Sequence, residues 1–221
     1  ANSALVGTSG GEWELLQFLN AEEISSDVWR LTGLLRGQCG TEREAMQLKK
    51  EGAPFILLND AVSPAGLKPQ EAGLELNWRI GCSGEEFSDQ FYSTKTKMGG
   101  LRVLQPLSPV HISTRMRPNG DMDIVWIRRG RIDADSWLSP EIPLGEEREA
   151  YHIEILFEER AVRSFEVTAS NWTYSASERL KDLGNPSVAF DFKVAMISAS
   201  VGLGQEAHCK FSPVFFEPTI I

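Results

Sequence analysis

The stretch FDFKVAMI, residues 190–197, places apolar side chains at Phe190, Phe192 and Val194 and polar side chains between them. Alternation with a period of two is typical of a β-strand that buries one face. Stretches of the same character recur through the second half of the chain, at residues 110–116, 123–128, 150–156, 164–168, 172–174 and 209–211. A set of short strands of this kind predicts an antiparallel, immunoglobulin-like β-sandwich over residues 106–221.

The same alternation identifies the side chains that should form the core of this sandwich. Trp126, Tyr151, Phe190 and Phe192 occupy inward-facing positions of their predicted strands. Large aromatic side chains contribute much of the buried area between packed sheets. We therefore expect these residues to meet in one core.

The first half of the chain predicts a smaller β-rich domain. Strand-like stretches lie at residues 12–18, 28–32, 54–58 and 74–80, with glycine-containing turns between them. A helix is expected over residues 41–51, with Thr41 as its N-cap and Glu44 completing a capping box. Pro106 and Pro109 stiffen a connector near residue 105. The sequence thus predicts an all-β protein with a barrel-like domain and one short helix at 1–105, followed by the sandwich at 106–221.

Composition argues against several functional classes. The chain has 221 residues, with 22 Lys and Arg against 31 Asp and Glu, and a formal net charge of −9 at pH 7. Proteins that bind nucleic acid usually have a basic stripe, so we expect no nucleic-acid partner. No apolar run approaches about 18 residues, so we expect no membrane insertion. Three widely spaced cysteines without a CxxC pair argue against a disulfide framework or a zinc site.

Several features of the second half resemble a fibronectin type III domain. Trp126 ends an early strand, Tyr151 begins a Tyr-x-Ile-x-Ile stretch, and the aromatic-rich strand at 190–197 comes late. The small-residue and glycine segment 199–204 follows it, as in that family. The resemblance implies a sandwich whose loops cluster at its two ends.

A narrower resemblance covers residues 13–204. The segment LLRGQCGTE, residues 34–42, is similar to a motif of phage tail-tip, or host-specificity, proteins. Further motifs occur in the same order, namely LSPVH at 107–111, WIRR at 126–129, DADSW at 133–137, PLGE at 143–146 and YHIE at 151–154. Together they resemble the C-terminal part of the large baseplate protein of gene transfer agents and related siphophages. Residues 215–221 match no part of it.

This resemblance implies a structural part of a tail tip or baseplate that holds fibre or receptor-binding proteins. Its partners would be those proteins and other tail-tip subunits. The expected location is the virion or phage-like particle, after assembly in the bacterial cytoplasm. The parent protein would be a homotrimer, although the fragment alone could be monomeric. Because the chain begins at Ala1 without a signal peptide, we expect it to be excised from that longer parent.

The candidate partner-binding site is a charged loop after the strand at 123–128. It contains Arg128, Arg129, Arg131 and Trp137. Arg and Trp are favoured at interface hot spots, and aspartates in the same loop could orient the arginines. The alternative interpretation is a solvated loop with weak surface ion pairs.

The glycines Gly33, Gly37 and Gly40 raise the question of a phosphate-binding loop. The Gly-Lys-Ser/Thr of a P-loop and the spacing of a dinucleotide-binding motif are both missing. We therefore expect these glycines to supply positive φ angles and close backbone approach at turns.

The sequence predicts no enzyme, no cofactor and no metal site. The chain contains no Gly-x-Ser-x-Gly, HExxH or Cys-His signature. Asp133 and Asp135 lack the further oxygen ligands that a calcium loop would supply. The histidines lie far apart in the sequence, at His111, His152 and His208.

A carbohydrate-binding module of a virion or secreted enzyme is the alternative function. Such sites need exposed aromatic side chains beside acids and amides. The candidate residues are Trp13, Trp29, Trp78 and Trp172. Alternation places most of them in a core, which favours the tail-tip interpretation.

Overall fold

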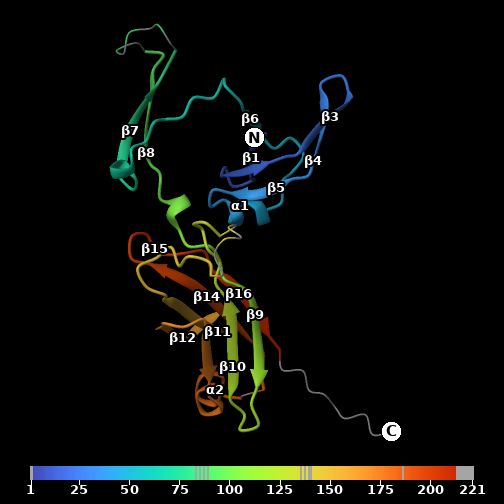
Figure 1. Cartoon of the computed structure of the whole chain (residues 1–221), viewed down its shortest axis with the longest axis vertical. Coiled ribbons are helices and arrows are strands. Elements are labelled where there is room, and N and C mark those ends of the chain that lie inside the picture. The colour runs from blue at the N-terminus through green and yellow to red at the C-terminus, as the bar shows by residue number, and fades with distance from the viewer. Residues whose placement is uncertain are drawn as a thin grey trace. The chain divides into compact units, whose positions relative to one another are not determined.

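The computed structural model describes residues 2–82, 84, 86, 88, 90–134, 136, 138, 141–185 and 187–212. The chain divides into two compact units, Ala1–Leu104 and Gln105–Ile221. Figure 1 shows that both units are built mainly from strands, so the protein is all-β. In the described residues no helix is long and apolar enough to span a membrane.

The described part of the C-terminal unit is a sandwich of two antiparallel sheets (Figure 1). One sheet has the order β13-β10-β9, from Asn171–Tyr174, Met122–Ile127 and Val110–Met116. In the other, β11 and β14 are central, and its strands are β12 (Arg160–Val167), β11 (Tyr151–Phe157), β14 (Phe190–Ser198), β15 (Gly202–Leu203) and β16 (Ala207–Phe211). This arrangement is fibronectin type III-like and confirms the predicted sandwich.

Trp126 lies at the centre of the sandwich core. Its ring centroid is 5.2 Å from that of Tyr151, with the planes at 78°, and 5.9 Å from that of Phe192. Phe190 meets Tyr174 edge-on at 5.8 Å. Edge-to-face contacts at these distances are the favoured geometry for aromatic pairs. The predicted core is confirmed.

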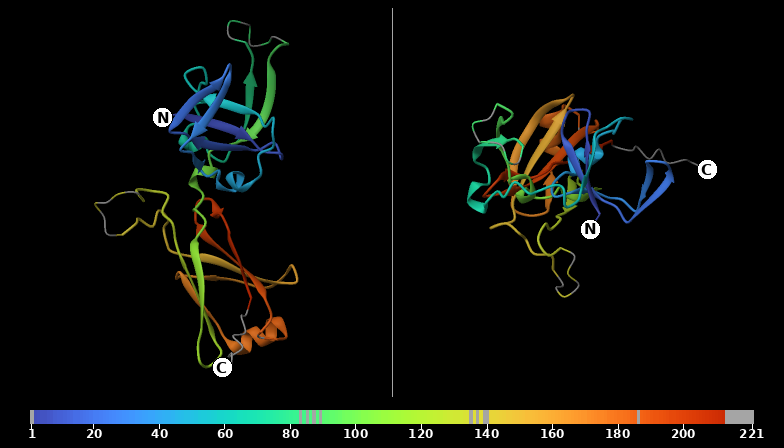
Figure 2. Two further views of the ribbon diagram at one scale, coloured as in Figure 1. Left: turned by 90° about the vertical axis from the view of Figure 1, so that its right-hand side faces the viewer. Right: turned by 90° about the horizontal axis from the view of Figure 1, so that it is seen from above.

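Helix α2 (Ala176–Leu183) lies between β13 and β14 and was not expected from the sequence. Ser175 and Glu178 form a capping box at its start, and Gly184 ends it with φ 70°. Figure 2 shows the helix beside the turn between β9 and β10. The buried Arg179 donates a hydrogen bond to the Gly120 carbonyl in that turn. The helix therefore closes this end of the sandwich.

The described part of the N-terminal unit is an open sheet with two separate hairpins. The sheet has the order β5-β2-β1-β6, from Leu35–Gln38, Trp13–Gln17, Ser3–Gly7 and Phe55–Leu58. The hairpins are β3–β4 (Asn20–Ser25 and Val28–Thr32) and β7–β8 (Glu75–Ile80 and Ser93–Met98). Short 3-10 turns lie at Pro69–Glu71 and Arg102–Leu104. The barrel-like prediction is wrong, because β4 and β7 pair within local hairpins instead of extending the central sheet.

The predicted helix at 41–51 is shorter than expected. Helix α1 spans Glu42–Met46, and the Thr41 side chain makes no capping bond to it. Instead, the Thr41 hydroxyl accepts a hydrogen bond from the Leu15 amide at 3.0 Å and donates to the Gln38 carbonyl at 2.8 Å. Thr41 therefore ties α1 to the sheet, and the capping-box prediction is wrong.

The sandwich core can be tested with two isoleucines of β10. Ile124 is 0% exposed, whereas Ile127 is 56% exposed. Ile124→Ala should lower the free energy of unfolding by about 2–5 kcal/mol, because it removes buried methyl groups and leaves a cavity. Ile127→Ala in the same strand should cost less than about 1 kcal/mol. Urea denaturation of the two variants measures the difference, and equal losses would contradict this core.

Candidate functional site

The three arginines of the predicted binding loop lie together at its base. Arg128 donates from Nη1 to the Pro143 carbonyl at 3.1 Å and from Nη2 to the Ile142 carbonyl at 2.5 Å. Arg131 donates to the Gly145 carbonyl at 3.1 Å and to Glu146 Oε1 at 2.9 Å. These bonds join the first residues of the loop to its last residues.

Arg129 fixes the loop to a second segment. Its Nε donates to the Ser108 carbonyl at 2.8 Å, in the stretch before β9. The Arg131–Glu146 ion pair is largely shielded, with side chains only 18% and 5% exposed. The structure therefore brings the predicted arginines together, but uses their guanidinium groups to position the loop.

Farther along the loop, the described residues include exposed apolar side chains. Trp137 and Asp135 lie outside the described residues. Leu138 is 97% exposed, and Ile132 and Ile142 are also exposed. The predicted contact patch did not include these apolar side chains, although Leu138 directly follows Trp137 in the sequence. The predicted contact patch stays a prediction, now with an apolar component.

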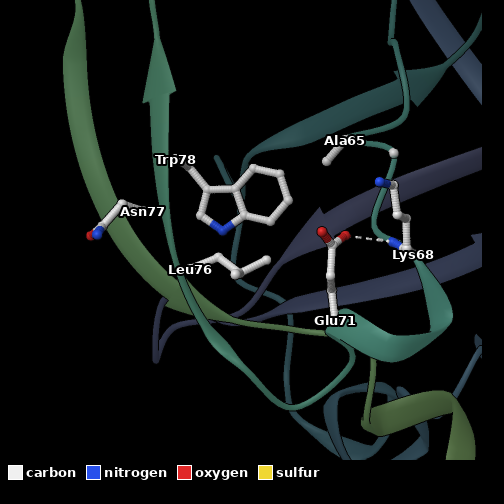
Figure 3. Close-up of a pocket in the computed structure, with 7 residues that line it drawn as sticks. Ala65, Lys68, Glu71, Leu76, Asn77 and Trp78 are labelled. Carbon is white, nitrogen blue, oxygen red and sulfur yellow. Dashed lines mark hydrogen bonds between the residues drawn. The ribbon is translucent and has the colours of Figure 1, made fainter.

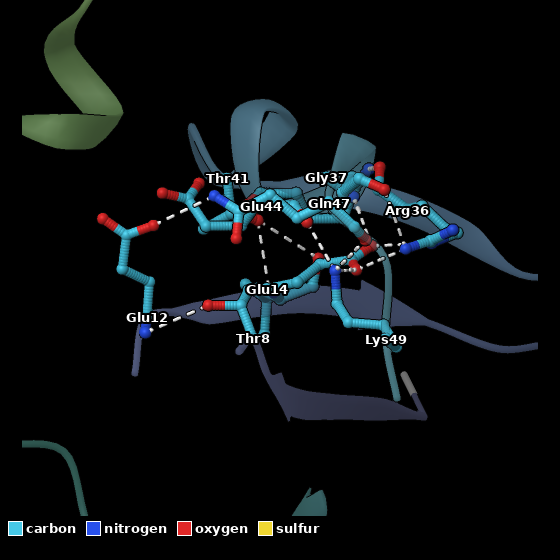
Figure 4. A network of polar contacts seen from close by, with 12 residues as sticks. Thr8, Glu12, Glu14, Arg36, Gly37, Thr41, Glu44, Gln47 and Lys49 are labelled. Atoms are coloured by element: carbon cyan, nitrogen blue, oxygen red, sulfur yellow. Dashed lines mark hydrogen bonds and ion pairs between the residues drawn. The ribbon is translucent and has the colours of Figure 1, made fainter. Parts of the chain in front are cut away.

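A second cluster of charges surrounds the buried carboxylate of Glu14 in the N-terminal unit (Figure 4). Glu14 on β2 is 0% exposed. It accepts bonds from Arg36 Nε at 2.8 Å and Nη2 at 2.6 Å, and Lys49 Nζ lies 3.0 Å from Oε2. The Gly37 amide also donates to Oε1, at 3.3 Å. Buried charges need this degree of pairing, so the cluster holds β5 and the segment after α1 against β2.

Glu44 extends this cluster from α1. Its side chain is 2% exposed, and its Oε1 lies 3.0 Å from Nη1 of Arg102. Lys49 Nζ also donates to the Glu44 backbone carbonyl. Glu44 does not complete the expected capping box, because the Thr41 amide that would donate to it donates instead to the Gln38 carbonyl at 3.2 Å.

Three glycines in the 34–42 motif and directly before it allow the chain to turn close to this cluster. Gly33, Gly37 and Gly40 have φ angles of 66°, 65° and 80°. A Cβ at Gly40 would lie only 2.6 Å from the Arg102 carbonyl oxygen. Positive φ and close approach both require glycine here, which confirms the prediction of turn glycines.

The pKa values of Glu14 and Arg36 are shifted by their contact with each other. Burial tends to raise the pKa of Glu14, but the hydrogen bonds from Arg36 and Lys49 outweigh it, so the pKa is lowered. The hydrogen bond to Glu14 raises the pKa of Arg36. Glu14 therefore stays ionised in the folded state.

The histidines do not come together. His152 Nε2 lies 3.2 Å from the Ser164 hydroxyl, and His208 Nε2 lies 3.0 Å from Asp191 Oδ1. Among the described residues no three His, Cys, Asp or Glu side chains are placed to hold a metal ion.

The four candidate tryptophans differ in their surroundings. Trp172 packs against the sandwich core, with Phe165 at 4.7 Å between centroids. Trp29 on β4 is 57% exposed, and Trp13 on β2 is half-buried. Trp78 on β7 lines an open hollow.

Comparison with known proteins gives partial matches. A family model described as "Rcc01698-like, C-terminal" matches residues 1–56, which include β1 to β5 and α1. The structure of the rat CD45 extracellular region, domains d3–d4, is 9% identical, with a TM-score of 0.35, over 87% of this chain and 93% of that chain. A fibronectin type III domain derived from human KIAA0970 protein is 17% identical, with a TM-score of 0.33, over 52% and 77%.

A beta-1,2-glucanase from Parabacteroides distasonis is 10% identical, with a TM-score of 0.29, over 96% of this chain and 25% of the glucanase. A search of curated proteins finds no match.

The buried Glu14 cluster predicts a specific acid sensitivity. Because the folded-state pKa of Glu14 lies below its ordinary value, its contribution to stability is present above the unfolded-state pKa of about 4.3 and is lost as pH falls through the folded-state value. Glu14→Gln should lower the stability of the N-terminal unit at pH 7 by about 2–3 kcal/mol and weaken this acid dependence.

Hydrogen exchange of the Leu15 and Gly37 amides, followed from pH 7 to pH 3, measures both effects. Glu22→Gln is the matched control, because Glu22 pairs with Arg30 at 3.7 Å with both side chains exposed. It should change stability by less than about 0.5 kcal/mol. Equal effects of the two substitutions would refute the structural role of Glu14.

Proposed function

We propose that this chain is a structural and binding part of a phage-like tail tip or baseplate. Its N-terminal unit would pack against other tail-tip subunits, and its C-terminal sandwich would hold a fibre or receptor-binding protein. The parent protein would be a homotrimer located at the tail tip of the virion. The role is non-enzymatic.

The observation that carries the proposal is the exposed apolar surface of the N-terminal unit. Among its described hydrophobic residues, only Ala4 and Leu16 are buried. Many large apolar side chains on its strands are exposed, including Trp29, Phe55, Ile56, Leu57 and Ile80. Two-stranded hairpins are marginal in water, and large exposed apolar surfaces mark interaction sites. Such a unit is suited to an assembly in which neighbours cover its strands.

The C-terminal unit supports the binding role in a different way. Buried side chains from both sheets form its core. The loop after β10 is fixed at its base by Arg128, Arg129 and Arg131. Binding residues are often found on loops that a rigid scaffold positions. The resemblance of the motifs at residues 34–42 and 107–154 to baseplate proteins supports the identity of the assembly.

The location is tested on particles that carry the tagged chain. Electron microscopy with an antibody to the tag should label the tail tip. Label on the capsid, or failure of the chain to enter any particle, would overturn the proposal.

Fibre capture is tested with substitutions in the loop after β10. Trp137→Ala should weaken capture of the purified fibre protein by at least about tenfold, the loss expected at a hot spot. Arg129→Ala should also weaken capture, because the loop loses its bond to the Ser108 carbonyl. Arg160→Ala is the control, since Arg160 is an exposed arginine at the start of β12. Surface plasmon resonance measures capture, and circular dichroism checks the fold. Unchanged capture by both loop variants would remove this loop from the interface.

A further inference from the structure

The β7–β8 hairpin forms one wall of an open hollow of about 320 Å³ (Figure 3). This volume lies at the lower end of the range of about 300–1,000 Å³ that is usual for small-molecule sites. Leu76 and Trp78 line it from β7, and Ala65, Lys68 and Glu71 line it from the segment before that strand. The hollow therefore combines an apolar surface with charged groups of both signs.

Trp78 provides a fixed aromatic face in this hollow. Its side chain is half-buried, and its Nε1 donates to the Lys97 carbonyl at 3.3 Å on the paired strand. The indole N–H is thus satisfied within the hairpin, and Figure 3 shows the ring directed toward Ala65 and Glu71. An aromatic face held in this way can stack against the apolar face of a sugar ring, whose C–H groups fit the negative face of the indole.

Glu71 provides a positioned acceptor opposite this ring. Its Oε2 accepts a hydrogen bond from the Lys68 amide at 2.8 Å, which fixes the direction of the carboxylate. Sugar hydroxyl groups are donors, and an ionised carboxylate accepts them at either oxygen. The hollow therefore offers stacking on one wall and hydrogen bonding on the other.

The charge around the hollow favours an anionic ligand. Lys95 lies directly opposite Trp78 in the β7–β8 ladder, and Lys97 lies directly opposite Leu76. Residues directly opposite in an antiparallel pair share one face, so both lysines are on the Trp78 side of the hairpin. Lys68 lines the hollow itself, so three cations lie in it or on the face of the hairpin that forms its wall, against one lining acid, Glu71.

We infer that this hollow binds a sugar residue that bears a carboxylate, such as a uronic or sialic acid unit of an acidic oligosaccharide. Trp78 stacks on the ring, Glu71 accepts hydroxyl groups, and Lys68, Lys95 and Lys97 attract the carboxylate. The inference does not depend on the tail-tip proposal, because it uses only the N-terminal unit.

The test is binding of the full chain to an array of neutral, uronic-acid and sialic-acid oligosaccharides, followed by titration calorimetry of the acidic sugars that bind. We expect acidic oligosaccharides to bind more tightly than their methyl esters, with an affinity that falls as salt is raised. Trp78→Ala should weaken binding at least tenfold. Trp29→Ala should leave it unchanged, because Trp29 is an exposed tryptophan of the other hairpin.

Two further variants separate binding from folding. Lys95→Gln with Lys97→Gln changes exposed residues, so it should leave the thermal unfolding curve unchanged. The double variant should weaken the preference for the acid over its ester, because only Lys68 remains to attract the carboxylate. Trp78→Phe keeps an aromatic ring in the hairpin and should retain part of the affinity if Trp78→Ala proves unstable.

Three results would overturn the inference. They are no binding to any acidic oligosaccharide, binding that neither Trp78 nor the two lysines affect, and binding to anionic vesicles or acidic peptides in place of sugars. Particles that carry Trp78→Ala should still show the chain at the tail tip, so failure of the sugar site and failure of the tail-tip proposal are distinguishable.

Discussion

The N-terminal unit depends on the buried carboxylate of Glu14. Most folds of this size are held by an apolar core, yet here only Ala4 and Leu16 are buried among its described hydrophobic residues. The bonds from Arg36 and Lys49 to Glu14 join β2, β5 and the segment after α1. Because removing one partner of this pair leaves an uncompensated buried charge, we expect the cluster to favour this arrangement of the strands over others.

The two units therefore reach stability by different physical routes. The C-terminal sandwich buries Trp126 and its aromatic neighbours between two sheets and covers one end with α2. The N-terminal unit leaves apolar strands uncovered and relies on charge pairing. In the proposed tail-tip role, the sandwich would be stable by itself, and neighbouring subunits would cover the exposed apolar strands of the N-terminal unit.

The sequence predicted the strands that show a clear pattern of alternating apolar and polar residues. Alternation identified the sandwich strands and the inward position of Trp126, because strand periodicity depends on adjacent residues only. It did not identify β3 and β8, because their side chains are exposed throughout and lack a regular apolar alternation. The pairing of β4 and β7 within hairpins was therefore missed, and the predicted barrel failed for that reason. Glu14 could not be recognised as buried, because Arg36 and Lys49 lie far along the chain. Ser175 and Glu178 form a capping-box signal for α2, in the 15-residue stretch between the strands predicted at 172–174 and 190–197. The arginines of the predicted binding loop were identified because Arg is favoured at interfaces. Their main-chain carbonyl partners could not be predicted, because every residue has a carbonyl group.

The way in which those arginines hold their loop has an evolutionary consequence. Arg128 and Arg129 bind main-chain oxygens at Ile142, Pro143 and Ser108, and Arg131 binds that of Gly145 as well as the Glu146 carboxylate. A carbonyl oxygen is present at every position whatever side chain stands there. These arginine-to-carbonyl bonds do not depend on the side chains between the two ends of the loop. Mutation can therefore diversify the loop while the sandwich keeps its structure. A loop that is anchored in this way can change its sequence under selection without a loss of stability in the domain that carries it.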